Sequence, residues 1–175
     1  LHKRVHGGRE AVVGGTEAWE AAGFDPGALD DLPPLVRFGT WIGGDRDGHP
    51  FVTADVTQAA LRALRINALR VQRRALEALG HDVPLGPIFQ TIPKELTAIV
   101  GRLYADLRGQ PGIDVDYIIE RNREEPWRAA AFLMRAKVLL AIEHPDSPAA
   151  YVSPEELDAD LATFASSLET AGASA

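Results

Sequence analysis

Residues 91–109 read TIPKELTAIVGRLYADLRG, and this stretch decides the fold class because it carries the clearest helical pattern in the chain. Thr91, Pro93 and Glu95 are typical of a helix start, and Gly109 is typical of a helix end. The apolar residues between these signals recur at helical spacing: Leu96, Ile99, Val100, Leu103, Tyr104 and Leu107. We therefore expect an amphipathic helix that buries one face.

A longer helix is predicted before it, ending at about Leu79. Thr53 or Thr57 suits its N-cap position, and Gly80 suits the left-handed position past its end. The pattern predicts an inward stripe of Leu61, Leu64, Ala68, Val71, Ala75 and Leu79.

Five arginines share one broad side of this helix, opposite much of the apolar stripe: Arg62, Arg65, Arg70, Arg73 and Arg74. We expect them to form a solvated face. Contact with an acidic partner surface is the alternative.

Two more helices are predicted towards the C-terminus. One covers residues 126–143, is stopped by Pro145, and turns inward Trp127, Ala130, Ala131, Met134, Val138 and Ile142. The other opens at Ser153, with Pro154 at the first helical position and Glu156 completing a capping box. It ends before Gly172 and buries Leu157, Leu161, Phe164 and Leu168. Four amphipathic helices can bury one another's stripes, so we expect a mainly α fold built as a helical bundle.

The remaining chain divides into connectors and one short strand. Residues 1–34 are broken by glycine and proline and form a loop-rich N-terminal segment, with a short helix at about residues 16–22. Residues 35–42, LVRFGTWI, suit a strand, but no other stretch offers it a partner. We therefore expect this chain to be a piece of a larger protein. A single helical turn is possible at residues 114–119.

The composition excludes several classes of function. The net charge of −7 argues against nucleic-acid partners, and no apolar run approaches the roughly 18 residues of a membrane span. With no cysteine, the chain has no disulfide framework, thiol nucleophile or thiolate metal site, which fits the cytoplasm.

The glycine-rich segment GGDRDGHP, residues 43–50, is the best candidate for chemistry. Its glycines allow backbone amides to surround an anion, and Arg46 offers a bidentate donor for phosphate or carboxylate. Asp45 and Asp47 flank the arginine. A tight turn held by an internal Asp–Arg pair is the structural alternative.

Other chemistries fit these residues poorly. Read as a calcium loop, the segment has Pro50 and Val56 where glycine and an acid are needed. It also lacks the lysine and hydroxyl of a P-loop and the spacing of a dinucleotide fingerprint. The other histidines are scattered without a triad pattern, so we predict no catalytic residue and no metal ligand in this chain.

The run FGTWIGGDRDGHP, residues 38–50, resembles the phosphoenolpyruvate carboxylase signature FGSWxGGDRDGNPxVT. Thr40 replaces its serine and His49 its asparagine. The later SPEELDADL stretch is similar to the same family, so the resemblance covers about residues 35–172. It implies a group of ligand-binding residues: Trp41, Gly43, Gly44, Asp45, Arg46, Asp47 and Gly48.

By this resemblance the chain is part of an enzyme that joins bicarbonate to phosphoenolpyruvate, giving oxaloacetate and phosphate. Such enzymes use magnesium or manganese, and their fold is a β/α barrel embedded in many helices. The resemblance also implies a homo-oligomer, with the remaining enzyme segments as partners. The predicted strand and its functional loop would then belong to that larger barrel.

The family's catalytic histidine segment, which reads like TAHPTE, is absent from these residues, as are its GRGGxxGRGGGP loop and its metal-binding acids. We therefore expect this chain alone to be inactive and to bind no metal. A noncatalytic helical interaction module is the alternative function.

Overall fold

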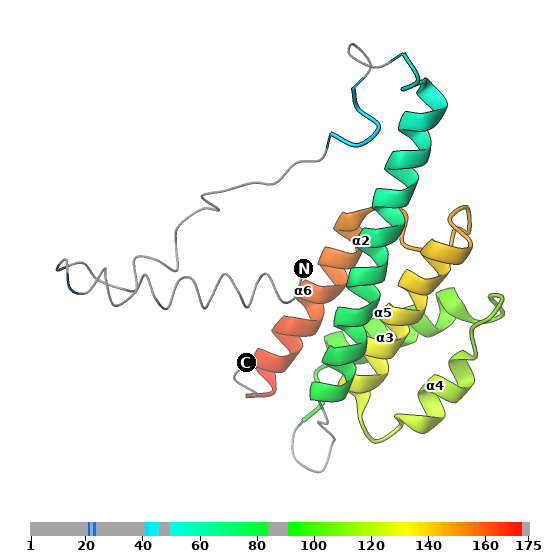
Figure 1. The fold of residues 1–175 in the computed structure, drawn as a ribbon. Coiled ribbons are helices and arrows are strands. Elements are labelled where there is room, and N and C mark those ends of the chain that lie inside the picture. The colour runs from blue at the N-terminus through cyan, green and yellow to red at the C-terminus, as the bar shows by residue number, and fades with distance from the viewer. Residues whose placement is uncertain (1–20, 22, 24–40, 46–49, 84–90, 173–175) are drawn as a thin grey trace. The chain divides into compact units, whose positions relative to one another are not determined.

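A computed structural model describes residues 21, 23, 41–45, 50–83 and 91–172. These residues contain five helices (Figure 1): α2 (Ala54–Asp82), α3 (Lys94–Leu107), α4 (Val115–Arg121), α5 (Pro126–Glu143) and α6 (Pro154–Thr170). The prediction of a mainly α fold is therefore confirmed over this part of the chain. The chain divides into two compact units, residues 1–62 and 63–175.

The predicted strand at residues 35–42 falls within the described residues only at its last two positions. Trp41 has no regular secondary structure and Ile42 begins a turn, so a strand reaching Ile42 is wrong. Residues 35–40 lie outside the described part, as does nearly all of the loop-rich segment 1–34. Ala21, inside the short helix predicted at 16–22, is helical.

Helix α5 is the centre of the second unit because most of its residues are buried. It buries 11 of its 18 residues, among them Trp127, Leu133, Met134 and Leu140. Its Trp127 Nε1 donates to Ser167 Oγ of α6 at 2.9 Å, so the buried indole has a partner for its N–H. A helix that buries apolar residues on more than one side has to be enclosed by others, and α3, α4 and α6 all pack against α5.

Helices α3 and α6 bury the predicted faces. In α3, Leu96, Ile99, Leu103 and Leu107 are buried, with Val100 and Tyr104 packed beside them. In α6, Leu157 and Phe164 are buried, with Leu161 and Leu168 partly so. The predicted stops are correct, because Gly109 and Gly172 follow the helices with φ of +79° and +77°.

The start of α6 differs from the predicted capping box. Pro154 is the first helical residue, as expected, but Ser153 makes no side-chain cap to the helix. Glu156 Oε2 instead accepts a hydrogen bond from the Val152 N–H at 3.3 Å, one residue earlier than a capping box requires. The Ser153 hydroxyl bonds to Glu155, which lowers the pKa of that carboxyl. The Ser153 hydroxyl therefore pairs with a side chain and does not cap the helix backbone.

Helix α4 (Val115–Arg121) is longer than the single turn that the sequence predicts at residues 114–119. Asp114 is its N-cap, accepting from the Tyr117 N–H at 2.9 Å. The Tyr104 hydroxyl donates to Asp116 Oδ1 at 2.6 Å and so ties α3 to α4. This bond, followed by burial, raises the pKa of Tyr104.

Helix α2 begins where the sequence predicts and ends later. Thr53 Oγ1 accepts from the Val56 N–H at 3.4 Å, so Thr53 is the cap. Gly80 does not occupy the left-handed position past the end, since the helix continues to Asp82. Packing explains why position 80 is a glycine, because a Cβ there would stand 3.1 Å from Phe132 Cζ. The Arg128 Nε–H also donates to the Gly80 carbonyl at 2.8 Å.

The predicted stripe of α2 is only partly correct. Leu61 and Leu64 are 62% and 40% exposed, and Ala68 is exposed too, whereas Leu76, which the stripe omitted, is buried. Within the second unit, Leu76 of α2 belongs to the core, and Leu69 and Leu79 pack against it. Several α2 residues have partners on α5 in reverse order: Arg65 with Ala141, Glu77 with Arg135 and Gly80 with Arg128. The two helices therefore run antiparallel over this stretch.

A charged network lies within the core between α3, α5 and α6. Asp160 is buried, and it accepts hydrogen bonds from Arg102 and, at 2.7 Å, from the Tyr151 hydroxyl. Lys137, also buried, lies 3.1 Å from Asp106 and over the Tyr151 ring at 4.9 Å. Because each buried charge has a partner, the core tolerates both.

Candidate functional site

The first half of the glycine-rich segment is a tight turn attached to helix α2. The Gly44 N–H donates to the Trp41 carbonyl at 3.0 Å, which closes a four-residue turn. Gly43 is the third residue of this turn and has φ +74°, a conformation that glycine adopts without strain. Its amino-acid type is thus required by the local backbone.

Packing against α2 imposes a second requirement for glycine at position 43. A Cβ there would stand 2.5 Å from the Ala60 Cβ, closer than two such carbons can approach. The Thr57 hydroxyl donates to the Gly43 carbonyl at 2.7 Å. The Thr57–Gly43 hydrogen bond and the close approach of Gly43 to Ala60 therefore hold the turn against the first part of α2.

The geometry assigns different tasks to the predicted site residues. The Trp41 side chain is 76% exposed and faces solvent. The amide of Gly44 is used within the turn, so that N–H is occupied as the structure stands. Asp45 is partly exposed and has an interaction of its own. Arg46, Asp47 and Gly48 lie outside the described residues, so anion binding by the whole segment stays a prediction.

Exposed apolar side chains occur within this turn and after it in the sequence. Ile42 and Phe51 are 78% and 77% exposed, and Val56 in the first turn of α2 is 43% exposed. Single exposed apolar side chains are normal on protein surfaces, so we assign no site to them.

The arginines of α2 are a second candidate site, although the sequence predicts them to form a solvated face. Arg62, Arg65, Arg70 and Arg74 are exposed, as expected. Arg73 is half-buried, and with Arg70 and Arg74 it lines a cavity of about 460 Å³ against α5. Helical periodicity could have shown that Arg73 lies three residues before the buried Leu76, on the same side of the helix.

The described residues show neither a metal-binding cluster nor a membrane span. Among residues 41–45, 50–83 and 91–172, no group of three or more His, Asp or Glu side chains could hold a metal ion. In the same part of the chain, no helix is both long enough and apolar enough to cross a bilayer.

Comparisons with known proteins agree on one family. The family model for phosphoenolpyruvate carboxylase matches residues 21–175. A phosphoenolpyruvate carboxylase of Rhodopseudomonas palustris (strain BisA53) is 34% identical over 146 residues, which cover 78% of this chain and 14% of that protein. One of Xanthomonas euvesicatoria pv. vesicatoria (strain 85-10) is 33% identical over 148 residues, covering 82% of this chain and 15% of that protein. No solved structure matches the chain.

The chain thus spans about one-seventh of the length of these relatives. The family match includes the turn, helix α2 and all four helices of the second unit. The motif noted at residues 38–50 falls within it, together with the glycine that the turn geometry requires. This chain belongs to the phosphoenolpyruvate carboxylase family.

Proposed function

We propose that this chain is the part of a phosphoenolpyruvate carboxylase that carries the GGDRDG loop on a helical support. The complete enzyme would carboxylate phosphoenolpyruvate with bicarbonate, giving oxaloacetate and phosphate. The observation that carries this proposal is the family match over residues 21–175, which contains the loop sequence. The names of the relatives support the same reaction.

The described geometry suggests what this part contributes. Thr57 and Ala60 hold Gly43 against α2, so the loop that follows starts from a fixed point. A loop held on a rigid element positions its side chains more reproducibly than a free one. We propose that Arg46 binds an anionic ligand of the complete enzyme, either substrate or a sugar-phosphate activator, with Trp41, Gly43, Gly44, Asp45, Asp47 and Gly48 shaping the site.

The metal, assembly and location of the complete enzyme are part of the same proposal. A magnesium or manganese ion would supply charge neutralisation for the reacting groups. Residues 41–45, 50–83 and 91–172 offer no ligand set for it, so we assign it to none of these residues. We also propose that the complete enzyme is a homo-oligomer and lies in the cytoplasm. The cysteine-free sequence supports the cytoplasmic location.

A chimera tests the proposal. The segment of the Rhodopseudomonas palustris enzyme that matches residues 21–175 is replaced by these residues, and oxaloacetate formation is followed with a coupled assay. We expect the chimera to remain an active carboxylase, because the replaced part has the same role in both chains. A folded chimera without carboxylase activity would favour the interaction module. The 175-residue chain alone is expected to give no turnover above the rate without enzyme.

Arg46→Lys in the active chimera tests the ligand role of the loop. Lysine keeps the charge and loses the bidentate fork, so we expect the KM for phosphoenolpyruvate or the activation constant for a sugar phosphate to rise about ten- to a hundred-fold. Arg62→Lys, on exposed helix surface, is the matched control and should leave both constants unchanged. If Arg46→Lys lowers only the melting temperature, the arginine braces the turn and binds no ligand.

A further inference from the structure

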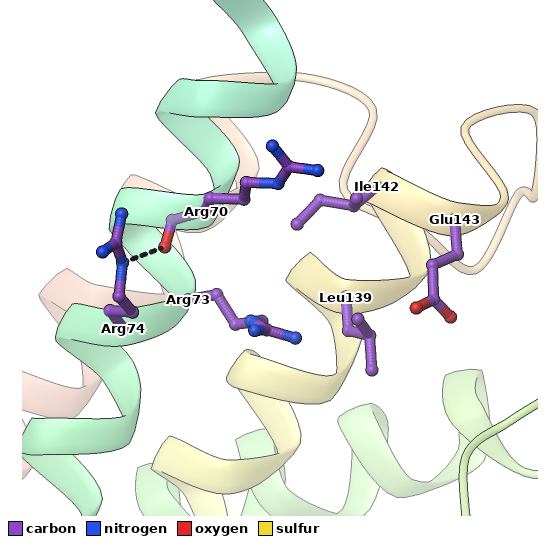
Figure 2. A pocket seen from close by; sticks show the side chains of 6 residues that line it. All are labelled: Arg70, Arg73, Arg74, Leu139, Ile142 and Glu143. Atoms are coloured by element: carbon purple, nitrogen blue, oxygen red, sulfur yellow. Dashed lines mark hydrogen bonds between the residues drawn. The ribbon is translucent and has the colours of Figure 1, made fainter.

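A cavity between α2 and α5 has the composition of an anion site. It measures about 460 Å³ and is lined by Arg70, Arg73 and Arg74 from α2 and by Leu139, Ile142 and Glu143 from α5. Figure 2 shows the side chains of Arg70 and Arg73 extending towards α5, with Leu139 and Ile142 on the opposite wall. Its volume lies within the range of about 300–1,000 Å³ that small-molecule sites have, and four of its six lining residues are charged.

Arg73 supplies the first indication of a missing ligand. Its Nε is buried, yet among the described residues it has no hydrogen-bond partner. Buried donors in folded proteins are almost always paired, so Arg73, which lines the cavity, carries a guanidinium group whose acceptors are not supplied by the described residues. The neighbouring Arg74 differs in this respect, since its Nε donates to the Arg70 carbonyl at 3.3 Å (Figure 2).

The charges around the cavity supply the second indication. Over residues 50–83 and 91–172, no carboxylate forms an ion pair with Arg70, Arg73 or Arg74, although the chain is acidic overall. Glu143 lies at the edge of the cavity, is exposed, and pairs with none of the three. The lining thus carries three positive charges and one negative charge, and its guanidinium groups are not neutralised from within.

We propose that this cavity binds a phosphate group, free or attached to a small molecule, at the guanidinium groups of Arg70 and Arg73. The two arginines are three residues apart, so they share a helix face, and each presents a planar fork of donors. A tetrahedral phosphate has acceptor oxygens in several directions and can accept from both forks. Leu139 and Ile142 form the wall for an attached apolar group. This site is separate from the glycine-rich loop and does not depend on carboxylase activity.

Arginine side-chain NMR tests the proposal on the 175-residue chain. Inorganic phosphate is titrated at constant ionic strength while the Nε–Hε resonances are followed, and phenyl phosphate is titrated in a second series. We expect a saturable shift of the Arg73 resonance with both, and tighter binding of phenyl phosphate because its ring can pack on Leu139 and Ile142. Equal affinities for the two phosphates would contradict the role of Leu139 and Ile142 as an apolar wall, while the phosphate site itself would stand.

Variants separate this site from general charge screening. Arg70→Gln and Arg73→Lys should each weaken phosphate binding by about tenfold or more, because each removes a charge-assisted fork. Arg62→Gln makes the same change of charge on α2 away from the cavity and should leave the affinity unchanged. Circular dichroism confirms that each variant is folded. The proposal is overturned if the Arg73 resonance does not move, or if Arg62→Gln weakens binding as much as Arg70→Gln.

Discussion

At position 43 the backbone conformation and the packing both require glycine. Its φ is +74°, and an added Cβ would collide with the Ala60 Cβ at 2.5 Å. Gly109 has a similar φ of +79° but open space around it, so it separates the two effects. An alanine at Gly109 meets only the backbone strain, which costs about 1 kcal/mol.

For Gly43→Ala we expect a larger loss, because the turn has to move away from α2 as well. The local readout is hydrogen exchange of the Gly44 amide, which donates to Trp41. Each loss of about 1.4 kcal/mol of local stability speeds this exchange about tenfold. Ala60→Gly removes the colliding atom, so the double variant should exchange more slowly than Gly43→Ala alone. Additive effects in this pair would contradict the proposed contact.

Tyr151 makes stability depend on alkaline pH. Burial, and then its hydrogen bond to Asp160, raise the pKa of Tyr151 far above the ordinary value of 10.0. Above about pH 10 the unfolded chain loses this proton while the folded chain keeps it. The free energy of unfolding should therefore be constant below about pH 10 with respect to this group and fall above it, by up to about 1.4 kcal/mol per pH unit.

Urea unfolding from about pH 9 to about pH 11 measures this effect. Tyr151→Phe removes the titrating hydroxyl, so its alkaline slope should be shallower than that of the parent chain. Its stability at neutral pH should also be lower by about 1–2 kcal/mol, because Asp160 loses a hydrogen bond. Tyr117, which is 59% exposed, gives the matched control Tyr117→Phe. If Tyr151→Phe keeps the full slope, Tyr151 is not the group responsible.

At the scale of elements, the glycine inside α2 is the feature that local sequence rules interpret wrongly. A glycine near a helix end usually marks its stop, yet Gly80 lies within the helix and faces Phe132. Gly101 also lies within a helix, α3, but a Cβ added there would meet no neighbouring atom within 4 Å. The pair therefore separates helix propensity from tertiary contact.

Gly80→Ala and Gly101→Ala should change stability in opposite directions. At Gly101 alanine should stabilise by about 0.5–1 kcal/mol, since it restricts the unfolded chain. At Gly80 the new methyl group would press on the Phe132 ring, and overpacking of this kind costs about 1–3 kcal/mol. Thermal unfolding of both variants measures the difference. A Phe132→Leu change should rescue Gly80→Ala, and two equally stabilised variants would exclude the close approach.

The sequence predicted those elements whose signals are local. The start of α5 at Pro126 and the stop of α3 before Gly109 follow from single residues with fixed backbone preferences. The inward side of α2 was not predictable in the same way. Its apolar residues outline more than one stripe, and the burial of Leu76 but not of Leu61 depends on where the core of the second unit lies.

The candidate sites show the same limit. GGDRDG could be recognised as a glycine-rich loop, because glycine and arginine in one run suit an anion. The spacing could not show that Gly43 packs on Ala60, since those residues meet only after the chain has turned into α2. Likewise the cavity beside Arg73 depends on Leu139 and Ile142, which are far from it in the sequence and meet it only in the fold.

At the scale of the whole molecule, the enclosure of α5 makes this helix a reporter of global unfolding. Its amides are surrounded by α3, α4 and α6, so deuterium can replace their protons only when the unit opens as a whole. The slowest peptide of α5 would then give the free energy of unfolding without denaturant, and its exchange would accelerate steeply in dilute urea. Peptides from the exposed first turns of α2 should exchange much earlier and respond little to urea. Mass spectrometry of the exchanging chain thus measures whether the second unit unfolds cooperatively. Equal exchange rates in α5 and in the first turns of α2 would mean that the helices open one by one.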